Sequence, residues 1–558
     1  MIPAAPPSPE RLAEILGMPL PTPEQARIIA HPLAPLLVVA GAGSGKTATM
    51  SQRVVHLVAG GQVRPDQILG LTFTRKATAE LEQRVRTRLA QLAVSGLPGL
   101  PELDEEAGPT IATYNAFAGS LVRDHGLRLG IDPDSTLITE ARAWQIATRI
   151  VTERTEPLPL DKPGAAATAL LALDGALSEN LLSVADAAEQ LGDLAALMEG
   201  IGSVRGCKTL VRGVPEALTT RLGMLDAVAA YRDYKLRHSL LDFGDQIALG
   251  CRIAEEVPDV AQSLRTQYPA VLLDEFQDTS VAQIRLLAAL FSDSGVTAVG
   301  DPNQAIYGWR GASAGALDTF HEYFNPGAGT DGVDERAPVL PLSTAWRNDR
   351  AILRAANVTS SPLRHHAPQP GDAAVARIPV DELHERPEAA GLAEGVVVGA
   401  FVQDPLAEAR TIADFMEERW SPQVEMAVLC RTRAQLVPIA DALEELGVPY
   451  EIVGLGGMLS VPEVADVRAA LTVAADPERG DRLLRLLTGA GIGAADLRAL
   501  AALARAQVRS AREQAGDGRS QAEREQPDAP LLSEAIETLA RWEETGRLPR
   551  TAASGDAE

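Results

Sequence analysis

The stretch PLLVVAGAGSGKT, residues 35–47, joins a short apolar run to a glycine-rich turn. The run predicts a buried strand, and the turn predicts the start of a helix directly after it. Small residues in such a turn let successive backbone N–H groups approach phosphate oxygens. The turn consists of Ala40, Gly41, Ala42, Gly43, Ser44 and Gly45, followed by Lys46 and Thr47.

Lys46 and Thr47 complete the chemistry that phosphate binding needs. The lysine adds a positive charge at the β- and γ-phosphates, and the threonine hydroxyl can bind Mg²⁺. The strict pattern of a phosphate-binding loop begins with glycine, where this chain has Ala40. The sequence therefore predicts a site for ATP and Mg²⁺. The alternative is a glycine-rich turn that binds nothing.

A second motif, AVLLDEFQD at residues 270–278, supplies the carboxylates that nucleotide hydrolysis requires. Four apolar residues predict a strand, and two acids follow at its end. Asp274 is the candidate ligand of Mg²⁺, and Glu275 is the candidate general base for the attacking water. The alternative is an acidic loop at the end of a strand, which is common for an isolated acidic pair.

Apolar runs alternate with helical stretches along the first part of the chain, which favours an α/β fold with a parallel sheet covered on both faces. The strand candidates are residues 35–40, 68–73, 270–273 and 296–299. Helical periodicity replaces this pattern from about residue 115 to residue 240. We therefore expect an inserted helical domain between two groups of sheet strands.

Composition limits the class of protein. A chain of 558 residues can hold three or four domains, and its net charge of −24 does not by itself favour nucleic acid as a partner. Only five residues are lysine, and Lys46 is one of them. The three cysteines are far apart, which favours a reducing cytoplasm and argues against a disulfide framework. No uninterrupted apolar segment approaches eighteen residues, so no membrane span is predicted.

Five motifs resemble those of the UvrD/Rep/PcrA-type superfamily 1 DNA helicases. They are PTPEQ (residues 21–25), LTFTRKATAEL (71–81), LDFGDQ (241–246), LLDEFQDT (272–279) and VGDPNQAIYGWRGA (299–312). The last of them is long and specific, and the resemblance extends over residues 21–493 as a whole. It implies an α/β fold with a RecA-like P-loop motor domain and a parallel sheet, an inserted helical domain and an incomplete second RecA-like domain.

The resemblance also implies domain boundaries. These are residues 18–113 and 241–357 for the first RecA-like domain, 114–240 for the inserted helices, 358–394 for a linker, 395–478 for part of the second RecA-like domain, and 479–558 for the start of its helical insertion. In the second domain we expect strands at 396–402, 426–431 and 450–454, with helices at 408–420 and 434–447.

Several nucleotide contacts follow from the resemblance. Gln25 would bind the adenine edge, and Gln304 would sense the γ-phosphate. In LPLSTAWRNDRAIL, residues 340–353, the family usually has asparagine, tyrosine, arginine and serine where this chain has AWRN. Arg347 would then approach the γ-phosphate, and Trp346 would stack on adenine. The alternative for Arg347 is an ion pair at the start of a helix.

Aromatic residues near the motifs are candidate DNA contacts. Tyr307 and Trp309 lie two apart in a polar, glycine-flanked loop, although only 4% of the chain is aromatic. Stacked bases are worth about 1–3 kcal/mol each, so exposed rings are typical of single-strand binding. The alternative is that the two rings belong to the core. The resemblance adds Phe73, Thr113, Tyr114 and Asn115 as DNA contacts, and the family often has histidine where Asn115 stands.

Together these motifs predict an ATP-dependent DNA helicase or translocase that acts on single-stranded DNA and its junctions with duplex. The resemblance implies 3′→5′ polarity and a role in repair or recombination. No segment matches the family's last motifs, and the TRA at residues 432–434 belongs to an earlier one, so we expect a truncated or shortened chain with weak activity. Some motifs resemble actinobacterial AdnB-like subunits, which pair with a second helicase–nuclease subunit. A non-motor subunit that binds ATP and DNA is the alternative.

Overall fold

The protein is described here by a computed structural model that falls into two compact units, residues 1–397 and 398–558. The described residues are 7–97, 108–204, 207–209, 211–292, 294–308, 311–312, 315–325, 337–365, 378, 380–453, 462–477, 479–515 and 532–545. No helix in these ranges combines the length and the apolar character that a bilayer crossing requires.

A six-stranded sheet with every neighbouring pair parallel forms the centre of the first unit. Its spatial order is β3 (Thr110–Thr113), β2 (Ile68–Thr72), β6 (Ala270–Leu273), β7 (Gly295–Gly300), β1 (Leu36–Ala40) and β8 (Val339–Leu342). The four strands expected from the apolar runs are all present. The outer strands β3 and β8 are less buried than the inner ones, and they were not predicted from the sequence.

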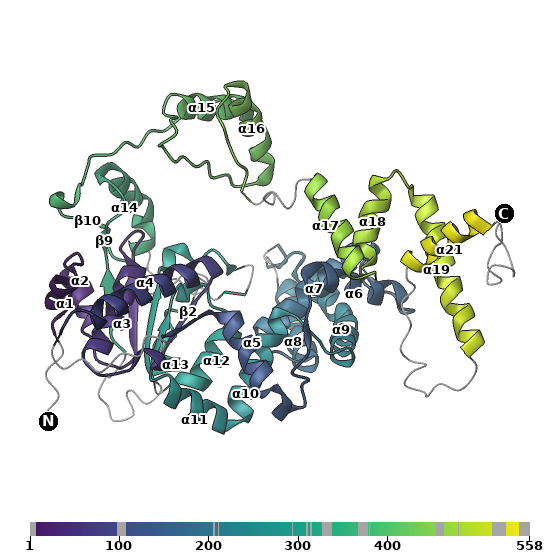
Figure 1. Ribbon diagram of the computed structural model, residues 1–558, viewed down its shortest axis with the longest axis horizontal. Coiled ribbons are helices and arrows are strands. Elements are labelled where there is room, and N and C mark those ends of the chain that lie inside the picture. Colours follow the sequence, from purple (N-terminus) through teal and green to yellow (C-terminus); the bar gives the residue numbers. More distant parts are fainter. Residues whose placement is uncertain are drawn as a thin grey trace. The chain divides into compact units, whose positions relative to one another are not determined.

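Helices cover both faces of this sheet, as a parallel sheet requires (Figure 1). Along β1 the side chains alternate, so Leu36 and Val38 join one core while Leu37 and Val39 join the other. Residues of the first face come from α1 (Pro9–Ile15), α2 (Pro23–Ile29), α3 (Lys46–Ala59) and α4 (Arg75–Ala93). Those of the second come from α5 (Tyr114–His125), α10 (Phe243–Glu256), α11 (Pro258–Gln267), α12 (Val281–Phe291) and α13 (Phe320–Phe324).

The parallel strands place their carboxyl ends along one edge of the sheet, which is where α/β folds bind ligands. β1 ends at Ala40, β6 ends just before Asp274, and β7 ends just before Asp301. β2 ends just before Phe73. The motifs found in the sequence therefore meet at a single edge, although they are far apart along the chain.

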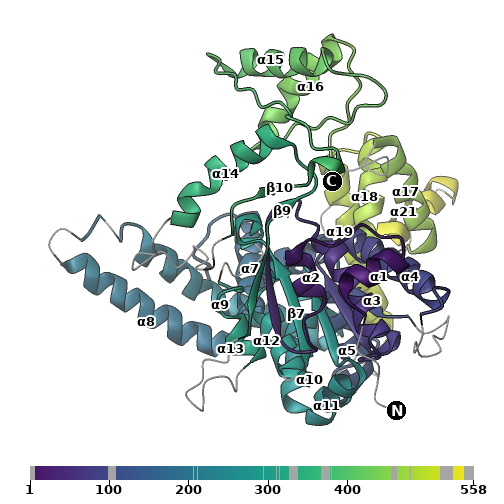
Figure 2. The same cartoon turned by 90° about the vertical axis from the view of Figure 1, so that its left-hand side faces the viewer.

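The inserted helices form a separate core. This core joins α6 (Glu140–Glu153), α7 (Pro163–Glu179), α8 (Val184–Ser203) and α9 (Val214–Arg237). Figure 2 shows α7, α8 and α9 side by side. Two short strands, β4 (Thr136–Leu137) and β5 (Leu240–Leu241), pair where the chain enters and leaves the insertion. The boundary at residue 114 needs correction, because α5 packs into the sheet core through Tyr114 and Phe117.

The segment after β8 differs from the expected linker. β9 (Thr344–Ala345) pairs with β10 (His384–Glu385), and α14 (Arg350–His365) continues past residue 357 into the range where a linker was expected. A short 3-10 turn, Glu388–Ala390, follows β10. Asn357 links α14 to the segment before β10, because its side-chain amide exchanges two hydrogen bonds with the backbone of Leu383.

The second unit contains helices but no strand in the part of the chain that the structure describes. The helices are α15 (Pro405–Glu417), α16 (Leu436–Glu445), α17 (Pro462–Ala475), α18 (Gly480–Gly489), α19 (Ala494–Ala515) and α21 (Leu532–Thr545). The expected helices near 408–420 and 434–447 are present as α15 and α16, which pack on each other. The strands expected at 396–402, 426–431 and 450–454 form no ladder in their described residues. A strand needs a hydrogen-bonded neighbour, and without one Phe401 and Leu429 stay exposed.

Candidate functional site

The glycine-rich turn leaves β1 and opens α3 in a conformation that its glycines permit. Gly43 and Gly45 have φ angles of 74° and 85°, which lie in the left-handed region that favours glycine. Gly45 is the N-cap of α3 and offers no side chain to the first N–H groups of the helix. An uncapped helix N-terminus with small residues in front of it is suited to an anion such as phosphate. Ser44 adds a buried hydroxyl that has no hydrogen-bond partner among the described residues.

Lys46 reaches across the sheet edge to the acidic pair. Its Nζ lies 2.6 Å from Oε2 of Glu275, which is 229 positions away in the chain. Thr47 follows it in the first turn of α3, and Asp274 precedes Glu275 at the end of β6. The structure thus brings the predicted phosphate lysine and the predicted carboxylates to one place.

The acidic pair combines a left-handed backbone at Glu275 with the burial of Asp274. Glu275 has a φ of 50°, a backbone conformation that costs a residue with a side chain about 1–3 kcal/mol and is found mostly at functional sites. Burial raises the pKa of Asp274 to about 6, with repulsion from Glu275 adding to the effect and Lys46 opposing it. Asp278 behaves similarly, since burial and Glu275 raise its pKa to about 6. Crowded carboxylates that resist ionisation fit a divalent cation, so the residues present suit Mg²⁺.

A chain of hydrogen bonds leads from this pair to the motif after β7. Gln277 donates from Nε2 to Oε2 of Glu275 at 2.9 Å, and its Oε1 accepts from the backbone N–H of Asp301, also at 2.9 Å. Asp301 in turn accepts from Nε2 of Gln304 at 2.5 Å. Lys46, Glu275, Gln277, Asp301 and Gln304 are therefore continuously connected. Gln277 and Asp301 were not predicted from the sequence, although both lie inside quoted motifs. The available signal was a polar residue directly beside the end of a buried strand.

The residues expected to contact adenine, Gln25 and Trp346, lie beside the glycine-rich turn at Gly45. A Cβ placed on Gly45 would lie 3.3 Å from Nε2 of Gln25 and 3.6 Å from the Trp346 ring. Gln25 is held by a capping box with Thr22, whose N–H donates to its Oε1 at 2.9 Å. The Trp346 backbone N–H donates to the Gly43 carbonyl at 2.9 Å, and its indole N–H finds no partner in the described part of the chain.

Arg347 also lies beside the turn. A Cβ on Gly43 would come within 3.2 Å of Cβ of Arg347 and 3.4 Å of Oδ1 of Asn348. The segment that carries them is fastened to α2, because Ser343 donates from its backbone N–H and its hydroxyl to the two oxygens of Glu24, at 2.8 and 2.6 Å. The elements that hold Gln25 and Arg347 are therefore tied to each other.

A groove of about 530 Å³ opens beside the acidic pair. Phe73, Thr113 and Asn115 line it, and the ring of Tyr307 lies 4.6 Å from that of Phe73. Trp309 lies outside the residues that the structure describes. These placements put most of the expected DNA contacts around one opening.

Tyr114 requires a correction. It borders the groove, but only 4% of it is exposed, and its ring belongs to the sheet core. Its hydroxyl donates to the backbone carbonyl of Asp274 at 3.0 Å. Tyr114 therefore supports the end of β6 and does not present its ring to the groove. Asn115 accepts at Oδ1 from Nε2 of Gln283 at 3.2 Å.

Phe243 is a groove residue that the sequence analysis overlooked. It is the first residue of α10, it is 50% exposed, and it lines the groove together with Arg75 and Arg123. An aromatic ring left half-exposed at a groove is a common feature of single-strand binding sites. The motif LDFGDQ held a partial signal, since it places an aromatic residue directly after a residue that can cap a helix.

Comparison with known proteins agrees with this geometry. The sequence model of the UvrD/REP helicase N-terminal domain matches residues 21–325. The ATP-dependent DNA helicase PcrA of Leuconostoc citreum is 26% identical over 494 residues, which are 86% of this chain and 56% of that protein. PcrA of Bacillus subtilis is 26% identical over 486 residues (84% and 55%), and the ATP-dependent DNA helicase UvrD1 of Mycobacterium tuberculosis is 26% identical over 501 residues (87% and 56%). The chain thus spans little more than half the length of these relatives.

Proposed function

Because this chain belongs to the family of the UvrD/REP helicase N-terminal domain, we propose that it is the ATP-hydrolysing part of a DNA helicase or translocase. The contact that carries the proposal is the 2.6 Å ion pair between Lys46 and Glu275. It joins the phosphate-binding turn to the acidic pair at the carboxyl edge of a parallel sheet, which is where a nucleoside triphosphate would be bound and hydrolysed.

Each residue of the edge has a defined part in hydrolysis. Lys46 leaves Glu275 to bind the β- and γ-phosphates, together with the N–H groups of the turn. Thr47 and Asp274 would hold Mg²⁺, which supplies positive charge to the phosphates. Glu275, once free of the lysine, accepts a proton from the attacking water, and Arg347 approaches the γ-phosphate from the far side of the turn. Gln25 and Trp346 hold the adenine.

Single-stranded DNA would occupy the groove beside this site. Phe73, Tyr307 and Phe243 offer rings on which bases can stack, and Trp309 is proposed to belong to the same set. Thr113 and Asn115 add polar contacts at the start of α5. Stacking tolerates any sequence, because every base has a flat face.

Gln304 would connect hydrolysis to movement on DNA. It ends the hydrogen-bonded chain that starts at Lys46, and it lies three positions before Tyr307. When ATP binds and Lys46 leaves Glu275 for the phosphates, the hydrogen-bonded chain that reaches Gln304 would change. This change would alter the position of the loop that carries Tyr307. Two arrangements of one loop, biased by the nucleotide, are sufficient for such coupling.

The direct experiment measures steady-state ATP hydrolysis by the 558-residue chain with and without an oligo(dT) strand. In the wild type we expect slow hydrolysis that DNA accelerates, in keeping with the weak activity expected of this chain. We expect no stimulation in Lys46→Ala, and nucleotide binding without stimulation in Gln304→Ala. An ATPase that ignores DNA in the wild type would contradict the proposal. We further propose 3′→5′ movement and a second helicase–nuclease subunit as partner, which end-labelled strand displacement and co-purification respectively would test.

A further inference from the structure

Lys235 is one of the most deeply buried charges in the described part of the chain. It lies near the end of α9 in the inserted helices and is only 2% exposed. Its ammonium group contacts three carboxylates, from Asp174 at 3.1 Å, Asp242 at 2.6 Å and Asp245 at 2.8 Å. Removing this ammonium would leave the partly buried carboxylates of Asp242 and Asp245 without a cationic partner among the residues that the structure describes, which is costly. Lys235 is therefore expected to hold both carboxylates in place.

Two of these carboxylates define the first turn of α10. Asp242 is its N-cap and Asp245 its third residue, and the two form a reciprocal capping box in which each backbone N–H donates to the other carboxylate at 2.9 Å. Phe243 lies between them. The ammonium group of Lys235 also contacts both of these carboxylates. The position of Lys235 therefore influences the orientation of the first turn of α10.

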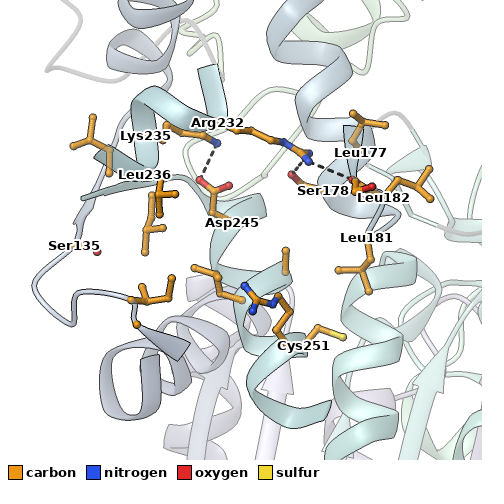
Figure 3. A pocket seen from close by; sticks show the side chains of 18 of the residues that line it. Ser135, Leu177, Ser178, Leu181, Leu182, Arg232, Lys235, Leu236, Asp245 and Cys251 are labelled. Atoms are coloured by element: carbon orange, nitrogen blue, oxygen red, sulfur yellow. Dashed lines mark hydrogen bonds and ion pairs between the residues drawn. The ribbon is translucent and has the colours of Figure 1, made fainter. Parts of the chain in front are cut away.

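The inserted helices hold the same turn from a second side. A Cβ on Gly244 would lie 3.0 Å from Cβ of Ser178, so α7 lies directly against the turn. Arg232 secures that end of α7 by donating to Asp174 at 2.5 Å and to the Ser178 hydroxyl at 3.2 Å. Figure 3 shows Arg232, Lys235, Asp245 and Ser178 around one cavity of about 580 Å³ between the inserted helices and α10.

We propose that Lys235 is a positioning residue that orients Phe243 in the DNA groove. The contact makes the presentation of a stacking ring depend on the inserted helices, through α9 and α7. It also gives a role to a lysine in the interior, where the ammonium must be dehydrated. The inference rests on the proposed binding of single-stranded DNA in that groove.

The test compares the affinity of four variants and one control variant of the whole chain for fluorescent oligo(dT), measured by anisotropy. Phe243→Ala should weaken binding about tenfold, since a stacked base is worth about 1–3 kcal/mol. Lys235→Met should approach the same loss, Lys235→Arg should recover most of it, and the double variant should bind no more weakly than Phe243→Ala alone. Lys162→Met, an exposed lysine at the start of α7, controls for the loss of one positive charge.

A second readout does not depend on DNA. Hydrogen exchange of the backbone amides at 242–246 should accelerate at least tenfold in Lys235→Met, whereas amides of α3 should keep their wild-type rates. Wild-type affinity in a folded Lys235→Met, unchanged exchange at 242–246, or additive losses in the double variant would overturn the role of Lys235. A wild-type chain that binds no oligo(dT) would instead overturn the proposed function of the groove itself.

Discussion

At the scale of single residues, Glu275 combines two tasks that conflict. It is the proposed general base, yet in this structure it holds the lysine that the phosphates need. Its strained backbone and its bond from Gln277 fix the carboxylate in place, so that only the lysine has to move. The position of the base is thus determined before any nucleotide binds, which is the kind of preorganisation that speeds catalysis.

Glu275→Gln should separate these tasks. We expect steady-state ATP hydrolysis to fall by about 10²–10⁴, the usual contribution of a general base. Affinity for a non-hydrolysable ATP analogue should be kept or increased, because an uncharged amide releases Lys46 more readily. Glu256→Gln, which removes an exposed acid paired with Arg252, is the matched control. Equal losses of affinity and turnover in Glu275→Gln would contradict this assignment.

Arg53 shows how a charge can support the site from within the core. It is fully buried, and its guanidinium donates to the carbonyls of Ile28, Ile29, His31 and Pro32 and to the Thr297 hydroxyl. Burial lowers its pKa to about 10. The arginine therefore closes the end of α2, which carries Gln25, and links it to α3 and β7.

Arg53→Met should lower the free energy of unfolding by about 3 kcal/mol or more, because each buried carbonyl left without a donor costs about 1–3 kcal/mol. Urea denaturation measures this change. Arg64→Met is the control, since it removes only an exposed ion pair with Asp66, which solvent screens. If Arg53→Met and Arg64→Met lowered the free energy of unfolding by similar amounts, the carbonyls that Arg53 binds would have found other hydrogen-bond donors.

At the scale of elements, the first turn of α10 is where the inserted helices meet the sheet domain. Burial, with repulsion from Asp242, raises the pKa of Asp245 to about 6. Between about pH 4 and pH 6 the folded protein keeps a proton on Asp245 that the unfolded chain has released. This carboxyl therefore makes the free energy of unfolding fall as the pH rises through that window.

Asp245→Asn should remove this slope. Urea titrations at about pH 4.5 and pH 7 measure the free energy of unfolding of both proteins. Relative to the wild type, the variant should be more stable at the higher pH than at the lower pH. A difference between variant and wild type that is the same at both pH values, or that changes in the opposite direction, would show that Asp245 ionises normally.

The sequence predicted those elements whose signal is local. The apolar runs before Gly41 and Asp274 predicted β1 and β6, because strands buried on both faces are continuously apolar. The contacts that complete the site are long-range and left no such signal. Gln277 meets Asp301 only because β6 and β7 are neighbours in the sheet. Tyr114 was misassigned for the same reason, since its contact with Asp274 depends on packing across 160 positions.

At the scale of the whole molecule, the net charge of −24 contrasts with a proposed DNA partner. Among the described residues that line the groove, the cations are Arg75 and Arg123, and Glu179 and Asp278 offset them. Affinity would therefore come mainly from stacked rings and less from phosphate contacts. The acidic remainder of the surface would discourage binding outside the groove.

This balance predicts a weak dependence of DNA binding on salt. Each neutralised phosphate of a single strand contributes about −0.7 to the slope of log K against log salt, so two arginines give a slope of about −1 to −2. Anisotropy titrations of oligo(dT) between 50 and about 300 mM salt measure it. A slope steeper than about −4 would mean that a more basic surface binds the DNA.

The proposed ATPase requires that Lys46 and Asp274 serve one nucleotide–metal site. Equilibrium titration of a fluorescent ATP analogue, with and without Mg²⁺, tests it in the wild type, Lys46→Ala and Asp274→Asn. We expect at least tenfold weaker binding in Lys46→Ala. In Asp274→Asn we expect the loss of the gain in affinity that Mg²⁺ gives the wild type. Wild-type binding in both variants, with the metal effect intact, would contradict it.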